Sequence, residues 1–89
     1  MTNAPASKLV HQLAAALQSR HLLLTTAESC TGGMIAASCT DLAGSSNWFD
    51  RGFITYSNDA KTQMLGVSSS LIRRHGAVSE ESAAAMAWV

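Results

Sequence analysis

Two polar clusters in the sequence carry side chains that could do chemistry. The first, TTAESCTGG, spans residues 25–33 and directly follows the apolar run LLL. The second, YSNDAK, spans residues 56–61 and ends with Lys61. A serine hydroxyl becomes a nucleophile when a neighbouring base removes its proton, and a lysine amine can be that base. The residue types of the two clusters therefore allow nucleophilic catalysis by a serine and a lysine.

The two glycines that end the first cluster, Gly32 and Gly33, have two interpretations. A turn needs glycine for its backbone angles, whereas a binding loop needs glycine so that a ligand can approach the backbone closely. If a helix begins here, its unpaired amide groups and positive dipole suit a phosphate or a developing oxyanion. A cap and turn without a ligand is the alternative, and the residues alone leave both open.

Lys61 is predicted to lie in the first turn of a helix, where the helix dipole disfavours a cation. A role as the base to a serine hydroxyl would explain this placement. A solvated surface lysine is the alternative, and Tyr56 could likewise be half-buried with its hydroxyl satisfied. Ser45 and Ser46 follow Gly44 at a predicted helix end, where Gly-Ser pairs are common and need no function.

A strand, a helix and a second strand are predicted to position these clusters. Periodic apolar residues predict a preceding helix over about residues 7–20, and LLLTT, residues 22–26, predicts a buried strand. GMIAASCTDLAG predicts a helix that Gly44 ends, and GFITYS, residues 52–57, predicts the second strand. Such a unit is nearly always right-handed and parallel, so both strands end at one edge of the sheet. Ligands of open parallel sheets bind at that edge, which places both polar clusters at one pocket.

Three more helices are predicted after the second strand. The first runs from Asn58, a plausible N-cap, to Gly66, the second ends at Gly76, and the third is capped by Ser79. The third helix has no stop signal before Val89. A two-stranded sheet cannot cover the apolar faces of these helices. We therefore expect residues 1–89 to be a single α/β unit that is part of a larger domain or needs partner chains.

The composition argues against several classes of protein. A chain of 89 residues has room for one small domain with a thin core. Lys plus Arg and Asp plus Glu are six each, which gives no basic field for nucleic acid. No run approaches the roughly 20 apolar residues of a membrane span. Cys30 and Cys39 lack metal-ligand spacing, and we expect reduced thiols in a cytoplasmic protein.

The motifs TTAESCTGG, AGSSNWFDRGFITYSNDAK, MLGV and HGAVSEE, in this order, resemble the CinA C-terminal domain family, which includes stand-alone nicotinamide-nucleotide amidases. The resemblance runs from about Leu9 onward and implies a three-layer α/β/α fold. It also implies hydrolysis of the carboxamide of nicotinamide mononucleotide to nicotinic acid mononucleotide and ammonia, without a metal or cofactor. Family members are longer, and their second half carries another glycine-rich loop. The chain is therefore expected to hold the N-terminal half of the family domain.

The resemblance also implies roles for individual residues. Ser46 of AGSS is the expected nucleophile, Lys61 of Y-S-N-x-x-K its base, and Tyr56 a hydrogen-bonding helper. Ser29 of AESCTGG is the second candidate for the nucleophile, and the sequence does not choose between the two serines. The substrate-binding residues are expected to be Glu28, Thr31, Gly32, Gly33, Ser45 and Asn58.

Two other functions stay open beside the amidase. The chain could bind a nucleotide or phosphate without turnover, because the missing half completes the pocket. It could instead only self-associate through exposed apolar helix faces. The small-molecule substrate is the one partner expected, apart from further copies of the chain in a homo-oligomer.

Overall fold

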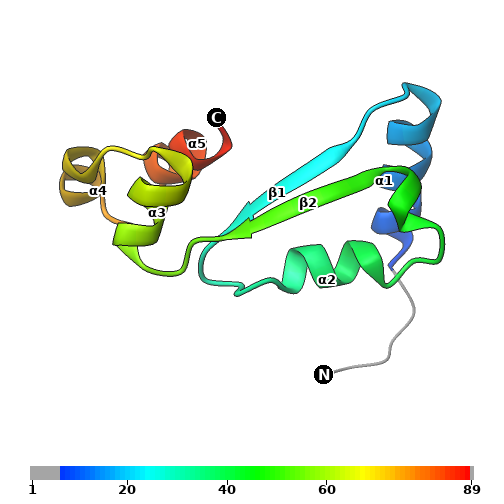
Figure 1. The fold of residues 1–89 in the computed structure, drawn as a ribbon, viewed down its shortest axis with the longest axis horizontal. Helices are drawn as coiled ribbons and strands as arrows, with labels where there is room; N and C mark the ends of the chain where they lie inside the picture. Colours follow the sequence, from blue (N-terminus) through cyan, green and yellow to red (C-terminus); the bar gives the residue numbers. More distant parts are fainter. Residues whose placement is uncertain (1–6, 89) are drawn as a thin grey trace. The chain divides into compact units, whose positions relative to one another are not determined.

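The computed structural model describes residues 7–88 and shows an α/β chain with α-helices and a two-stranded sheet (Figure 1). A strand, a helix and a strand follow the first helix, as the sequence predicts, and three helices come after them. The elements in chain order are α1 Lys8–Ser19, β1 Leu24–Glu28, α2 Met34–Thr40, the 3₁₀ turn η1 Ser45–Asn47, β2 Phe49–Ile54, α3 Asn58–Leu65, α4 Ser69–His75 and α5 Glu80–Ala87.

The two strands are hydrogen-bonded to each other and run parallel (Figure 1). At the start of β1 the amide of Leu24 donates to the carbonyl oxygen of Trp48 over 2.7 Å. At its end the amide of Thr55 donates to the carbonyl oxygen of Glu28 over 2.8 Å. Because both strands end at the same edge, the segments that follow them leave from that edge, as predicted.

The element boundaries differ from the prediction in both strands and in the helix between them. β1 spans Leu24–Glu28 instead of residues 22–26, and β2 ends at Ile54 instead of Ser57. β2 begins at Phe49, three residues before the predicted start at Gly52. The side chain of Phe49 packs against the buried Trp48, with the rings edge to face and their centroids 6.4 Å apart. Helix α2 ends at Thr40, and Gly44, with φ +82°, begins the 3₁₀ turn instead of ending the helix.

Serine side chains begin four of the helices. Ser7, Ser57, Ser68 and Ser79 each occupy the N-cap position, and each hydroxyl accepts a hydrogen bond from the amide three residues later. These bonds satisfy amide groups that have no partner inside the helix. The prediction of Asn58 as the N-cap of α3 is therefore wrong by one residue, because Ser57 occupies the N-cap position.

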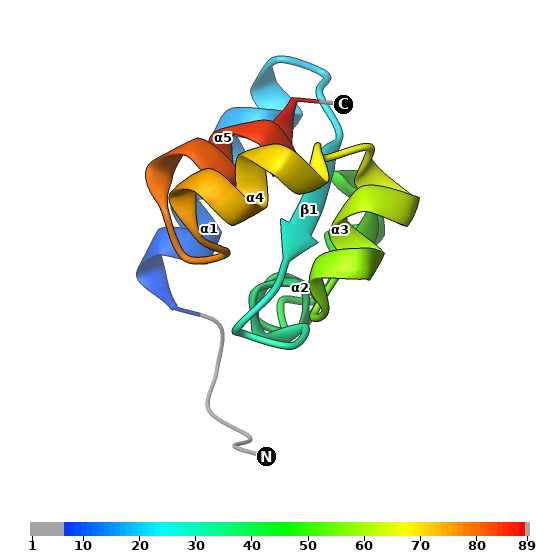
Figure 2. The ribbon, with the colours of Figure 1, turned by 90° about the vertical axis from the view of Figure 1, so that its left-hand side faces the viewer.

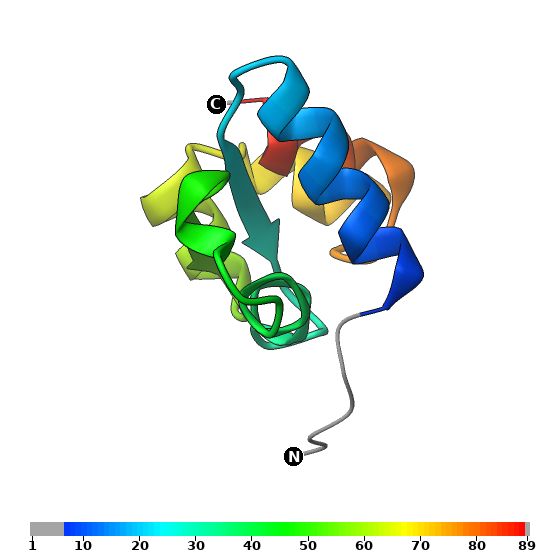
Figure 3. The same cartoon turned by 90° about the vertical axis from the view of Figure 1, so that its right-hand side faces the viewer.

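Within the described residues, the first of two compact units consists of residues 7–26 and 33–52, and it contains α1, α2 and η1. Its buried core is made by Ala14, Cys39 and Trp48. Figure 3 shows α1 with the loop that leads from it into β1. Cys39 is buried and Cys30, in the other unit, is exposed, and neither forms a disulfide bond within the described residues. Further apolar side chains pack around this core from Val10, Leu17, Leu24, Leu42 and Phe49.

The second unit consists of residues 27–32 and 53–89 and contains α3, α4 and α5. Figure 2 shows α4 and α5 side by side. Helix α5 ends at Ala87 without a glycine, and Trp88 is its C-cap. The buried core of this unit is formed by Leu65, Val67, Ile72 and Met86.

Candidate active site

The segment after β1 forms a turn that is tied to the last residue of the strand. Glu28, only 2% exposed, accepts a hydrogen bond on Oε1 from the hydroxyl of Thr31 over 2.7 Å. The amide of Gly32 donates to the carbonyl oxygen of Ser29 over 3.0 Å, and Gly32 has φ +60°. A left-handed conformation of this kind favours glycine. The half-buried Ser29 thus lies in a turn that is braced from both sides.

The segment after β2 is held against the same strand end. Thr55 is completely buried, and its amide donates to the carbonyl oxygen of Glu28 over 2.8 Å. Its hydroxyl donates to the same oxygen over 3.4 Å. Both hydrogen bonds lie within the second unit. Glu28 is therefore hydrogen-bonded to the segment after β1, through Thr31, and to the segment after β2, through Thr55.

Lys61 is a buried lysine with a defined contact. Its side chain is 1% exposed although it lies in the first half of α3, and its Nζ donates to the carbonyl oxygen of Tyr56 over 3.3 Å. Within residues 7–88, Nζ of Lys61 makes this one hydrogen bond. The Tyr56 side chain is 71% exposed and Asn58 is exposed as well. A solvated surface lysine is therefore ruled out, and so is a half-buried Tyr56.

Ser45 and Ser46 lie in the first unit on the short turn η1. The amide of Ser45 donates to the carbonyl oxygen of Leu42 over 3.2 Å, and its own carbonyl accepts from the amide of Trp48 over 3.0 Å. Because Trp48 is 1% exposed, it anchors the end of this turn in the core. Ser45 is half-buried and Ser46 is exposed, so the hydroxyl-bearing turn faces solvent.

Gly33 begins α2, as predicted, with φ +109° and no side-chain cap. Its carbonyl accepts a hydrogen bond from the amide of Ala37 over 2.9 Å, which closes the first turn of the helix. Gly33 belongs to the first unit together with Ser45 and Ser46. The second unit brings together the remaining predicted site residues, which are Glu28, Ser29, Thr31, Gly32, Tyr56, Asn58 and Lys61.

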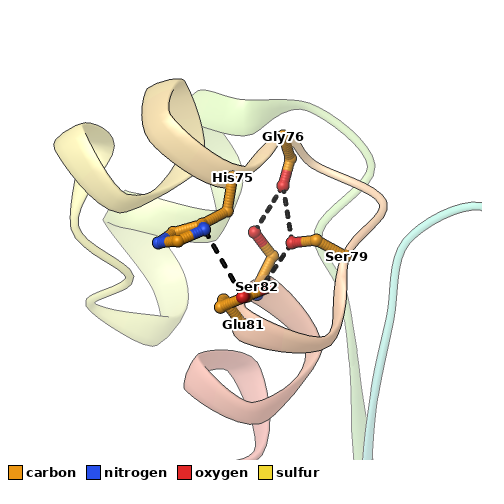
Figure 4. Close-up of polar contacts among 5 residues, drawn as sticks. All are labelled: His75, Gly76, Ser79, Glu81 and Ser82. Atoms are coloured by element: carbon orange, nitrogen blue, oxygen red, sulfur yellow. Dashed lines mark hydrogen bonds and ion pairs between the residues drawn. The ribbon is translucent and has the colours of Figure 1, made fainter.

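Two features escaped the sequence analysis. Thr55 lies within the predicted second strand, and its position directly before Tyr56 is the signal that the sequence offers for it. The other is a polar cluster between α4 and α5 (Figure 4). The carbonyl oxygen of Gly76 accepts from the hydroxyls of Ser79 over 2.9 Å and Ser82 over 2.6 Å. The Nδ1 atom of His75 lies 3.4 Å from Oε2 of Glu81.

The described part of the chain holds no group of three or more His, Cys, Asp or Glu side chains that could bind a metal ion. None of the helices within residues 7–88 has the length and apolarity that a bilayer crossing requires.

Comparison with protein families and curated proteins gives consistent matches. The sequence model of the CinA C-terminal domain matches residues 6–88. A protein named nicotinamide-nucleotide amidohydrolase PncC, from Escherichia coli strain K12, is 55% identical over 80 residues. That alignment covers 90% of this chain and 48% of the relative.

Solved structures match the same region. The competence/damage inducible protein CihA from Agrobacterium tumefaciens superposes with a TM-score of 0.87 at 47% identity, covering 91% of this chain and 49% of that one. A CinA superfamily protein from Escherichia coli gives a TM-score of 0.87 at 37% identity, covering 94% and 48%. The predicted fold class is confirmed, and the chain spans about half the length of each of these three relatives.

Proposed function

We propose that this chain, which belongs to the CinA C-terminal domain family, hydrolyses the carboxamide of nicotinamide mononucleotide. The products are nicotinic acid mononucleotide and ammonia. The observation that carries the proposal is the 55% identity over 80 residues to the Escherichia coli nicotinamide-nucleotide amidohydrolase. The substrate class is taken from the name of that relative.

The proposed mechanism is nucleophilic catalysis on an amide. The Oγ atom of Ser46 bonds to the carboxamide carbon while the Lys61 amine takes the hydroxyl proton. The tetrahedral intermediate then collapses, the C–N bond breaks, and Lys61 returns the proton to the departing nitrogen, which leaves as ammonia. Water, with Lys61 again as base, cleaves the resulting ester and releases the acid and the free serine.

The contacts of Lys61 support its role as the base. Burial and the hydrogen bond to the Tyr56 carbonyl oxygen restrict the Lys61 amine to one position. A base needs such a fixed position, because it must lie within hydrogen-bond distance of the proton that it removes. The exposed phenol of Tyr56 suits the proposed helper role, since its hydroxyl is accessible to a ligand. Ser29 is the second candidate nucleophile, and it lies in the same unit as Lys61.

The proposed substrate contacts come mainly from loop residues. A Cβ atom added at Gly32 would meet no heavy atom of the described residues within 4 Å, so the space beside this backbone is open to a ligand. Glu28, being buried, would shape the pocket wall through Thr31. The other proposed contacts are the main chain of Gly33 and the polar groups of Ser45 and Asn58.

The decisive experiment measures ammonia release from nicotinamide mononucleotide by the purified chain. The parent and a Lys8→Ala variant are expected to release ammonia, and Lys61→Ala is not. Lys8 is the matched control because it is the other lysine of the chain and is exposed. Absence of release by the parent would refute the proposed activity for this chain, and equal release by Lys61→Ala would refute the role of the lysine.

The two serines are separated by single substitutions. Ser46→Ala is expected to abolish release, because no other group replaces the attacking oxygen, while Ser29→Ala retains part of it. The reverse order would make Ser29 the nucleophile. Ser38→Ala serves as the control, since Ser38 is exposed and its hydroxyl only donates to the carbonyl oxygen of Met34 within α2.

Binding without turnover is the second candidate function. The observation that favours it is the coverage of 48% of the amidohydrolase relative, because the remaining part of that relative could supply substrate contacts. Calorimetric titration with nicotinamide mononucleotide would then show saturable binding although no ammonia is released.

Self-association is the third candidate, favoured by the exposed side chains of Leu9, Val78 and Trp88. It predicts concentration-dependent sedimentation without ligand binding.

A further inference from the structure

The residue that joins the two polar segments is Thr55. Both of its donors, the amide at 2.8 Å and the hydroxyl at 3.4 Å, point at one acceptor, the carbonyl oxygen of Glu28. A carbonyl oxygen has two lone pairs and can accept both bonds. The side chain of Thr55 is 0% exposed, so it does not reach a ligand in solvent.

The hydrogen bonds continue on both sides of this junction. The carboxylate of Glu28 accepts from the hydroxyl of Thr31, which fixes the turn that contains Ser29. Tyr56 follows Thr55 directly in the chain, and its carbonyl oxygen accepts from Nζ of Lys61. One path of hydrogen bonds and main chain thus leads from Thr31 to Lys61, entirely within the second unit.

We propose that Thr55 is a positioning residue, whose hydroxyl fixes the Tyr56 carbonyl and thereby the amine of Lys61. A β-branched side chain suits the end of a strand, but valine has the same shape and would fill the same space. The hydroxyl is buried and therefore needs a partner, and Glu28 supplies it. Its position beside Tyr56 links this hydrogen bond to the lysine. The inference rests on the proposed function only in naming Lys61 as the base.

The test uses the fact that the chain contains two lysines, the exposed Lys8 and the buried Lys61. A short pulse of acetic anhydride followed by peptide mass spectrometry gives the ratio of acetylation at Lys61 to that at Lys8. In Thr55→Val this ratio is expected to rise about three- to tenfold, the effect of losing one hydrogen bond. Thr55→Ser retains the hydroxyl and should restore the parent ratio. Thr25→Val, at an exposed threonine of β1, is the matched control.

Alkylation of the buried Cys39 in the same samples separates local movement from unfolding. Cys39 is 3% exposed and lies in the first unit, so it should stay unreactive in Thr55→Val. An unchanged lysine ratio in Thr55→Val would overturn the proposal. Reactive Cys39 in that variant would also overturn it, because the hydroxyl would then support the whole fold and not the lysine.

An activity measurement adds a second readout and keeps the two proposals apart. If the parent releases ammonia, Thr55→Val should lower kcat and leave KM nearly unchanged, since the substrate does not contact Thr55. Equal changes in kcat and KM would contradict positioning through the base. If the parent releases none, the proposed activity fails, but the acetylation ratio still decides the role of Thr55.

Discussion

The Nζ atom of Lys61 lies 3.3 Å from the main-chain oxygen of Tyr56, in a side chain that is 1% exposed. Burying a cation costs free energy unless its donors are satisfied, and a position early in a helix adds the unfavourable dipole. One carbonyl oxygen satisfies one of the three donors of an ammonium group. Burial with one hydrogen bond makes lysine an unfavourable residue at this position, and a catalytic role would explain why it is there.

Replacing Lys61 with methionine is expected to separate stability from activity. The Lys61→Met side chain fills a similar volume without a charge, so the free energy of unfolding should rise by about 1–2 kcal/mol. Ammonia release should be lost because the base is gone. Urea unfolding followed by circular dichroism measures the first effect, with Lys8→Met as the exposed control. A marked fall in stability would show that Lys61 is part of the structural framework.

The sequence predicted the order of helices and strands because the local signals agree with the fold. Apolar residues at three- and four-residue spacing mark α1, and glycine at Gly66 marks the end of α3, where it has φ +69°. The start of β2 was missed because Asp50 and Arg51 are typical of a loop, and only the packing of Phe49 draws this segment into the strand. Tertiary contacts of this kind leave no periodic signal.

The candidate residues were predictable by type and spacing, but their environments were not. Neither the burial of Lys61 nor the exposure of Tyr56 follows from a motif, since both depend on tertiary packing. Thr55 was missed for the same reason, because its partner Glu28 precedes it by 27 residues. The 3.4 Å contact between His75 and Glu81 likewise depends on how the chain turns between α4 and α5.

We expect glycine to be required at position 52, because a larger residue would clash with Thr26 on the neighbouring strand. A Cβ atom at this position would lie 2.6 Å from Oγ1 of Thr26, which is closer than real Cβ contacts. Gly52→Ala should therefore lower the free energy of unfolding by about 1–3 kcal/mol. Removing the obstructing atom should rescue it, so Gly52→Ala in a Thr26→Ala background should cost little beyond Thr26→Ala alone. Urea unfolding of the four proteins gives this coupling, and additive effects would contradict the contact.

The same substitution is expected to have opposite effects at two buried threonines. Oγ1 of Thr26 has no hydrogen-bond partner among the described residues, whereas Oγ1 of Thr55 donates to Glu28. Thr26→Val should raise the free energy of unfolding by about 1 kcal/mol, because it removes an unsatisfied buried hydroxyl. Thr55→Val should lower it by a similar amount of about 1 kcal/mol. Thermal unfolding measures both, and changes of the same sign would refute the assignment of partners.

Gly66 and Gly76 both have positive φ but are expected to tolerate asparagine differently. Gly66, at φ +69° and ψ +19°, has the left-handed helical conformation that asparagine adopts at modest cost. Gly76, at φ +84° and ψ +157°, lies in a region that is essentially restricted to glycine. Gly76→Asn should lower the free energy of unfolding by about 1–3 kcal/mol, and Gly66→Asn by clearly less.

The environment of Gly76 explains why the chain cannot simply relax to another conformation there. Its carbonyl oxygen is held by the hydroxyls of Ser79 and Ser82, and Ser82 is 0% exposed (Figure 4). Rotating the backbone to suit asparagine would break both bonds and leave the Ser82 hydroxyl buried without a partner. Adding Ser82→Ala to Gly76→Asn should therefore cost less than Ser82→Ala costs in the parent. Urea unfolding of the two single variants and the double variant measures this coupling, and strictly additive losses would show that the serine does not hold the glycine in place.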